Sequence, residues 1–158
     1  MTTYSGKSDG AMPLSRAGMS WRRPTIETKF HIDMSWWEGH GRDIRVFMRD
    51  MLCDACAQAL PEDVSELEDV DWVDEETAEV HRVDALWHSL RTCCSTKPEY
   101  INPSTPIVDA VFLTFLANGN QPLSIQELYE LLDRRPPRTL LRILTGDQVY
   151  MGIRPVRL

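Results

Sequence analysis

The chain has 158 residues, of which 42% are hydrophobic and 26% are charged, a composition typical of a folded protein. Its formal net charge is −7. The chain has four cysteines but no expected secretory signal, which argues against a disulfide-bonded extracellular scaffold. The longest apolar stretch, residues 107–117, is interrupted by Asp109 and is too short to cross a bilayer, so we expect a cytoplasmic protein without membrane contacts.

The charge is unevenly distributed along the chain. Residues 1–101 contain 11 Lys and Arg against 19 Asp and Glu, a balance of −8, whereas residues 102–158 contain 6 against 5, a balance of +1. The first part should repel nucleic acid and the second could tolerate it. This asymmetry predicts two modules. We expect a disordered tail at 1–28, an acidic module at 29–96, a proline-rich linker at 97–104 and a second domain at 105–158.

The acidic module is expected to begin with a short strand at 30–33 and a helix. Ser35, with Glu38 three residues later, matches a capping box, in which a side chain at the helix start binds free backbone N–H groups. Apolar residues then recur at helical spacing as far as Leu52. The pattern predicts one helix over 35–52, with a weak point at the Gly-His-Gly step of residues 39–41.

A β-hairpin and a second helix are expected to follow. Residues 61–79 contain ten acidic residues and no Lys or Arg, and their early part reads as a solvated loop. Apolar and polar residues alternate on both sides of residues 75–77, which is typical of a hairpin with a longer turn. Asp84 then begins a helix that ends near Cys93.

The four cysteines are expected at the ends of the two helices of the acidic module. Cys53 and Cys56 form a CxxC pair, whose spacing lets both thiolates reach one metal ion, and Cys93 and Cys94 follow later. Adjacent cysteines seldom bind one ion comfortably. We therefore expect a zinc site formed by Cys53, Cys56 and Cys94, with either Cys93 or His88 as the fourth ligand.

His40 is a further candidate for the fourth position, and ordinary buried thiols without metal are the alternative to the whole site. Zinc is favoured over an iron–sulfur cluster, because a structural ion would supply folding energy to a module with a thin core. A thioredoxin-like redox role is disfavoured, because such a CxxC opens a helix and this one is expected to close one.

Residues 105–158 are expected to form three helices and a strand. Asn118-Gly119-Asn120 ends the first helix with residues that accept left-handed backbone angles. Ser124 and Glu127 form a second capping box at the start of the next. The expected order is helix 105–117, helix 124–132, helix 137–146 and strand 149–153.

This order, together with the sequence LANGNQPLSIQELYELL at 116–132, resembles a winged helix-turn-helix domain. The resemblance covers residues 105–156 and implies that the third helix is the recognition element. It also implies that the arginines on or near that helix and the strand bind the partner: Arg134, Arg135, Arg138, Arg142 and Arg154. A protein partner is slightly favoured over DNA, because the unit carries only +1 and its third helix is largely apolar.

The sequence thus predicts a mainly α protein with small β-hairpins (α+β), in which a zinc-stapled helix–hairpin–helix module precedes a winged-helix-like domain. The expected function is non-enzymatic binding by a small regulatory or adaptor protein, with DNA or a transcription or translation component as partner. The alternatives are a structural subunit of a larger assembly and a metal-dependent enzyme accessory subunit. No small-molecule substrate is evident, because the chain has no glycine-rich phosphate loop and no hydrolase motif.

Overall fold

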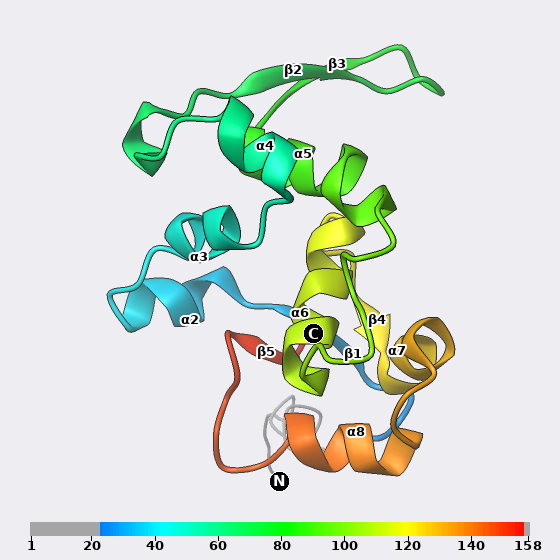
Figure 1. The fold of residues 1–158 in the computed structure, drawn as a ribbon. Coiled ribbons are helices and arrows are strands. Elements are labelled where there is room, and N and C mark those ends of the chain that lie inside the picture. Colours follow the sequence, from blue (N-terminus) through cyan, green and yellow to red (C-terminus); the bar gives the residue numbers. More distant parts are fainter. Residues whose placement is uncertain (1–22, 157–158) are drawn as a thin grey trace, which may run out of the picture.

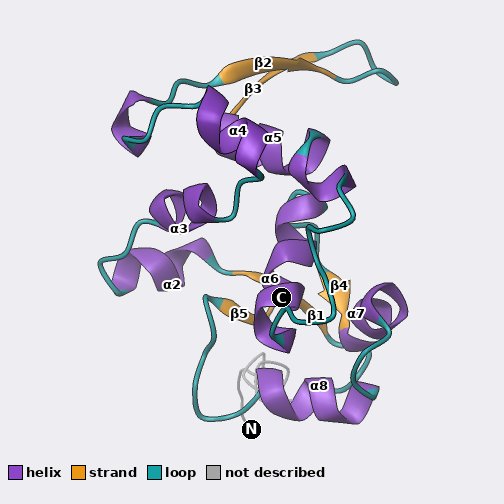
Figure 2. Cartoon of the chain, viewed as in Figure 1, coloured by secondary structure: helices purple, strands orange, loops and turns teal. Residues whose placement is uncertain are grey.

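The computed structural model describes residues 23–156, which form seven α-helices and two small antiparallel sheets (Figures 1 and 2). The mixed α+β class is confirmed, whereas most of the predicted tail lies outside the described residues. The elements are β1 (Lys29–Ile32), α2 (Met34–Gly39), α3 (Ile44–Asp50), α4 (Asp54–Ala59), η2 (Val64–Glu66), β2 (Val70–Val73), β3 (Val80–Val83), α5 (Ala85–Thr92), η3 (Cys94–Thr96), α6 (Ile107–Ala117), β4 (Leu123–Ser124), α7 (Ile125–Leu132), α8 (Pro137–Leu144) and β5 (Ile153–Pro155).

Helix α6 is the centre of the molecule. All residues from Ala110 to Leu116 are buried, and a helix that is apolar around its whole circumference must be surrounded by other elements. Figure 1 shows α5 above α6, the sheet and α7 level with the lower half of α6, and α8 below it. The helix ends as predicted, because Gly119 (φ +72°) and Asn120 (φ +61°) adopt the left-handed backbone angles that stop it.

The larger sheet joins segments from both ends of the chain. Its strand order is β4-β1-β5, and Phe30 of β1 lies opposite both Leu123 and Pro155. Strand β1 was expected in the acidic module, yet both its neighbours come from the C-terminal unit. Buried residues from the two units also form one hydrophobic core. The division into two domains therefore stays a prediction.

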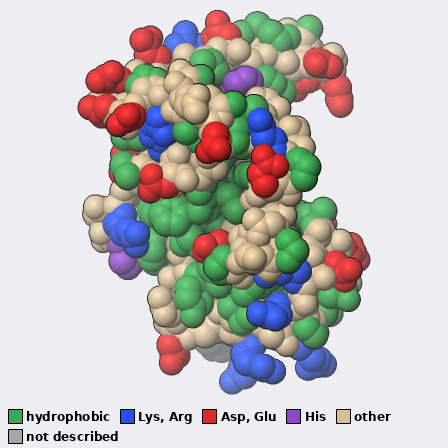
Figure 3. All heavy atoms as spheres, viewed as in Figure 1, with side chains coloured by type: hydrophobic (Ala, Val, Ile, Leu, Met, Phe, Trp, Pro, Cys, Tyr) green, Lys and Arg blue, Asp and Glu red, His purple; other side chains and the backbone are tan. Residues whose placement is uncertain are grey.

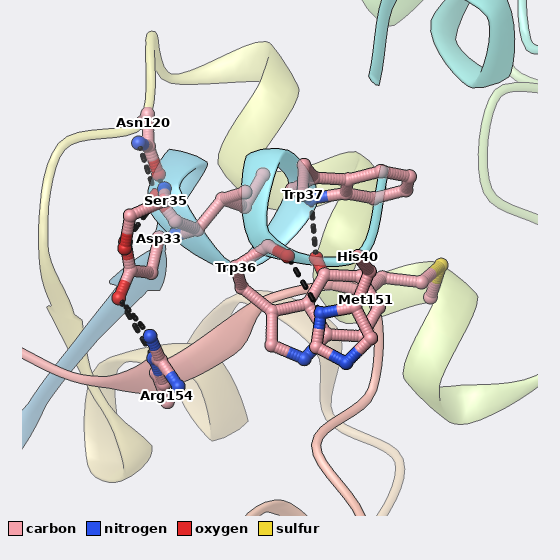
Figure 4. A network of polar contacts seen from close by, with 9 residues as sticks. Asp33, Ser35, Trp36, Trp37, His40, Asn120, Met151 and Arg154 are labelled. Atoms are coloured by element: carbon pink, nitrogen blue, oxygen red, sulfur yellow. Dashed lines mark hydrogen bonds and ion pairs between the residues drawn. The ribbon is translucent and has the colours of Figure 1, made fainter. Parts of the chain in front are cut away.

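A network of polar contacts holds β1 and β5 to helix α2 (Figure 4). The Trp37 indole N–H donates to the Met151 carbonyl at 3.0 Å. Arg154 donates to one carboxylate oxygen of Asp33 from Nε at 2.7 Å and from Nη2 at 2.6 Å. Hydrogen bonds from Ser35, and then Arg154, lower the pKa of Asp33 to about 2. Arg154, expected to bind a partner, is thus engaged in an internal ion pair.

The predicted single helix over 35–52 is wrong. The chain instead forms α2 and α3, separated by a turn in which Gly41 has φ +64°. The expected Ser35 cap is also wrong, because the Asp33 side chain accepts the Ser35 N–H and is the true N-cap. Asp43 accepts the Arg45 N–H in the same way and begins α3. Two caps and a left-handed glycine therefore outweigh a continuous apolar period.

Several local predictions are confirmed. The hairpin pairs Val70 with Val83 and Val73 with Val80, and Asp84 caps α5. The Ser124–Glu127 capping box is present with both of its hydrogen bonds. The last strand begins at Ile153, later than expected, because the positive φ angles of the two residues before it place them in a turn.

Within residues 23–156, no helix combines the length and the apolar composition needed to cross a membrane.

Candidate metal centre

The CxxC pair lies at the start of a helix, contrary to expectation. Cys53 is the N-cap of the short helix α4, and Cys56 lies in its first turn. The Cys56 N–H is the largest contribution that lowers the pKa of the Cys53 thiol to about 7. The objection that this CxxC closes a helix, which counted against a redox role, is therefore removed.

The second cysteine pair meets the first between α5 and η3. Cys94 is buried, with 1% of its surface exposed, and its Sγ lies 3.3 Å from Cys53 Sγ. The Sγ atoms of Cys53, Cys56 and Cys94 all lie within 4.8 Å of one another. Cys93 Sγ is 4.0 Å from Cys53 Sγ, on the edge of the same group. The chain thus brings all four predicted cysteines together.

These distances fit a tetrahedral metal ion. Zinc–sulfur bonds of about 2.3 Å place neighbouring sulfurs of a tetrahedral site roughly 3.8 Å apart. The two measured separations, 3.3 and 4.0 Å, lie on either side of that value. The Cys53 N–H also donates to Cys94 Sγ at 3.2 Å, an outer contact of the kind that orients a thiolate ligand. Three close cysteines could therefore hold a metal ion, with a fourth at the edge.

The electrostatics of the group depend on a neighbouring cation. Burial raises the pKa of the thiols of Cys56 and Cys94, so without a positive charge these groups stay protonated at neutral pH. Lys97 lines the same cavity as Cys53 and Cys94, and the negative charge of the Cys53 and Cys93 thiolates raises the pKa of Lys97. A divalent ion would displace the thiol protons, and its affinity would fall as the pH falls.

The two histidines lie apart from the thiols. His88 lies on α5 and lines a different cavity, together with Trp72 and Trp87. His40 Nδ1 is 2.7 Å from the Trp36 carbonyl oxygen, and its ring packs on the Trp36 indole. The structure therefore brings Cys93 next to the group and leaves His88 outside it.

A cavity of about 380 Å³ opens beside the sulfurs. Cys53 and Cys94 form part of its wall, which also contains four charged residues (Asp54, Lys97, Glu99 and Asp109) among apolar and hydroxyl-bearing side chains. Sequence patterns do not reveal this grouping, because Asp109 comes from the first turn of α6 and Lys97 from the predicted linker. Only the crossing of the linker over α6 brings them together.

The predicted arginines are distributed over the lower end of the molecule. Arg138 and Arg142 are exposed and one helical turn apart on α8, and Arg135 is exposed just before it. Arg134 is half-buried, and within residues 23–156 its Nη1 has no hydrogen-bond partner. Figure 3 shows Lys and Arg side chains along the lower end, where α8 lies, and many Asp and Glu side chains in the upper part. We call Arg135, Arg138 and Arg142 the α8 arginine face.

Comparisons with protein-family models, with characterised proteins and with solved structures found no match to this chain.

Proposed function

We propose that this protein works by binding a partner, and that a zinc ion held by Cys53, Cys56, Cys93 and Cys94 stabilises the upper region of the molecule (residues 53–96). The convergence of four thiols from two distant segments carries the proposal. Thiolate sulfur is the ligand that structural zinc sites use most, and a closed set of four protein ligands leaves no position for a substrate.

The upper region has few buried side chains to stabilise it. Helix α4 and strands β2 and β3 contain no buried residue, and only Leu67 is buried between residues 53 and 84. A segment with so few buried side chains gains little from the hydrophobic effect. An ion that ties α4 to α5 would supply the missing folding energy, because binding to the folded state alone stabilises that state.

The partner surface in this proposal is the α8 arginine face of a winged-helix-like unit. The element order α6-β4-α7-α8-β5 supports the assignment, although β1 supplies the central strand. Residues 134–146 contain four arginines and no acidic residue. Leu131, 63% exposed, lies nearby in the sequence and adds apolar surface.

A protein partner fits this surface better than DNA. Arginine with exposed apolar side chains is typical of protein interfaces. Helix α8 has only eight residues, Arg154 is engaged with Asp33, and the net charge of −7 opposes DNA at long range. We therefore propose a regulatory or adaptor role on an acidic protein surface.

Metal content is the first test. Elemental analysis of the purified protein should give about one zinc per chain, and a chelator should lower the melting temperature. The Cys93→Ser variant should lose zinc affinity, whereas His88→Gln should retain it. Absence of bound metal after reconstitution with zinc, together with unchanged unfolding in chelator, would overturn the zinc site.

The partner surface is tested separately. A photo-crosslinking residue placed at Leu131 should capture a partner in cells, and Arg138→Glu with Arg142→Glu should abolish that product. The same crosslinker at Val46, which is 52% exposed on α3 and lies outside the α8 arginine face, is the matched control. Tight, salt-dependent binding of duplex DNA that is lost in the double variant would instead establish DNA as the partner.

A catalytic metal site is the second candidate, and the charged cavity beside Cys53 and Cys94 favours it. In this reading only Cys53, Cys56 and Cys94 would bind the ion, Cys93 would stay free, and a water molecule or substrate would complete the coordination. Substitution of cobalt for zinc distinguishes a catalytic site from a structural one. A thiocyanate-induced change in the cobalt absorption bands would indicate an open position, whereas an unchanged spectrum supports the closed four-thiolate site.

A further inference from the structure

A second cavity, of about 460 Å³, lies between the β2–β3 hairpin, α5 and the end of α6. It does not include any of the four cysteines. Its volume lies within the range of small-molecule sites. The lining residues are Trp72, Val83, Asp84, Trp87, His88, Arg91, Thr92, Ala117 and Gly119.

Two indoles give this cavity its aromatic surface. Trp72 projects from β2 and Trp87 from α5, so the two rings come from different elements. Both side chains are only half-buried, which leaves ring surface open to the cavity. Trp72 is supported across the hairpin by His81, whose ring centroid lies 5.8 Å from that of the indole. Such surfaces favour a flat aromatic ligand.

The single carboxylate in the lining is already engaged. Asp84 accepts the Leu86 N–H at 2.8 Å as the cap of α5, and its other oxygen lies 2.8 Å from Arg45 Nε. Its negative charge is therefore compensated by the helix start and by a guanidinium. The carboxylate is not free to bind a cationic ligand.

The remaining polar side chains offer donors. Across residues 23–156, Arg91 forms no ion pair and the His88 ring forms no hydrogen bond. The Arg91 guanidinium lies against Gly119, where an added Cβ would be 3.0 Å from Nη1. This glycine lets the guanidinium lie close to the backbone at the cavity edge. A guanidinium without an acceptor is the usual partner of a carboxylate, to which it can donate two parallel hydrogen bonds.

We infer that this cavity binds a small planar aromatic carboxylate, whose ring packs on Trp72 and Trp87 and whose carboxylate accepts hydrogen bonds from Arg91. The acidic hairpin weakens this preference only modestly. Asp71 is paired with Arg82 at 3.6 Å, and exposed charges farther than about 8 Å are screened at physiological ionic strength.

The test uses two probes with the same ring. Calorimetric titration of the full chain with indole-3-carboxylate should show binding roughly tenfold or more tighter than with indole-3-carboxamide, because one charge-assisted hydrogen bond pair is worth at least about that factor. Arg91→Gln should remove the difference. Arg135→Gln, an exposed position just before α8 and outside the cavity, should retain it. Amide shifts of Thr92 and Gly119 should report the bound carboxylate.

Three results would overturn the site: equal affinity for the two probes, a difference that survives in Arg91→Gln, or no binding of either probe at millimolar concentration. Should Arg91→Gln fail to fold, the amide shifts decide the matter in the wild-type protein. Shifts confined to residues away from Thr92 and Gly119 place the ligand elsewhere and reject the proposal.

Discussion

The two ends of the molecule are stabilised in different ways. Below α5, helix α6 is buried at seven consecutive positions, and Leu128, Leu140 and Ile153 extend that core into α7, α8 and β5. Above it, α4 and the hairpin bury no residue. Cys56, Ala57 and Val70 in these elements are only partly buried against the core, and the cysteine group adds polar contacts between the start of α4 and η3. The lower region thus depends on apolar burial, and the upper region depends on polar contacts and, in our proposal, on a metal ion.

Loss of the metal ligands should have the largest effect and should be confined to the upper region. Cys94→Ser should lower the free energy of unfolding by on the order of 3 kcal/mol or more, because it removes a buried ligand. Hydrogen exchange should increase in α4 and the hairpin while α6 stays protected. Ser95→Ala, at the neighbouring position, is the control and should leave exchange unchanged. An equal increase of hydrogen exchange in α6 would contradict the proposal that the metal stabilises the upper region alone.

Core truncation should affect the lower region independently of metal. Leu128→Ala should lower the free energy of unfolding by about 2–5 kcal/mol, because Leu128 of α7 is fully buried. Leu131→Ala on the same helix removes a side chain that is 63% exposed and should change stability by no more than about 0.5 kcal/mol. Denaturant unfolding with and without chelator measures both. If chelator changed the loss of unfolding free energy caused by Leu128→Ala, the stability of the lower region would not be independent of metal.

A glycine substitution tests the junction of β5 with α2. Gly152 has φ +78°, and a Cβ there would lie 2.9 Å from Trp37 Nε1. Gly152→Ala should therefore destabilise the protein by about 1–3 kcal/mol. Gly39, where a Cβ meets no atom within 4 Å, is the matched position. Gly39→Ala should be neutral or stabilising by up to about 1 kcal/mol in thermal unfolding.

The smallest expected effect concerns pH. The pKa of Asp33 falls from 3.8 to about 2 on folding, so its contribution is complete above pH 3.8 and is lost as the pH falls through 2. Asp33→Asn should cost about 1 kcal/mol or less at neutral pH, since the ion pair is partly exposed. The difference between wild type and variant, measured by thermal unfolding, should shrink between pH 4 and pH 2. A constant difference would show that Arg154 contributes little through charge.

Sequence patterns sufficed where one local signal decided the structure. The hairpin, the Ser124–Glu127 capping box and the Asn118-Gly119-Asn120 helix end all depend on residues a few positions apart. The helix over 35–52 failed because periodicity alone ignores caps. The acidic stretch shows the same limit, since Asp63 caps η2 and Asp74 accepts the Glu76 N–H, roles that a count of charges does not reveal.

The cysteine group was predictable in part. The CxxC spacing predicted that Cys53 and Cys56 lie together with Cys94, and the three Sγ atoms do lie within 4.8 Å of one another; their role as metal ligands stays a prediction. Which residue lies at the fourth position depends on how α5 ends, because the turn into η3 directs Cys93 toward Cys53. Helical spacing does not encode that turn. The two cavities could not be predicted from the sequence, since each is lined by elements that meet only in the folded chain.

The central position of β1 has a consequence for chain connectivity. The Val156 N–H donates to the Lys29 carbonyl at 2.9 Å, so the start of β1 and the end of β5 are direct neighbours. The chain between Lys29 and Val156 therefore begins and ends at the same place in the fold. A circular permutant that joins these two points would convert the most distant strand pair into a simple hairpin, and new ends could be opened in the exposed β2–β3 turn. The β1–β5 hydrogen bonds would then join residues that are close in sequence and would form early. This should speed folding without altering the folded state.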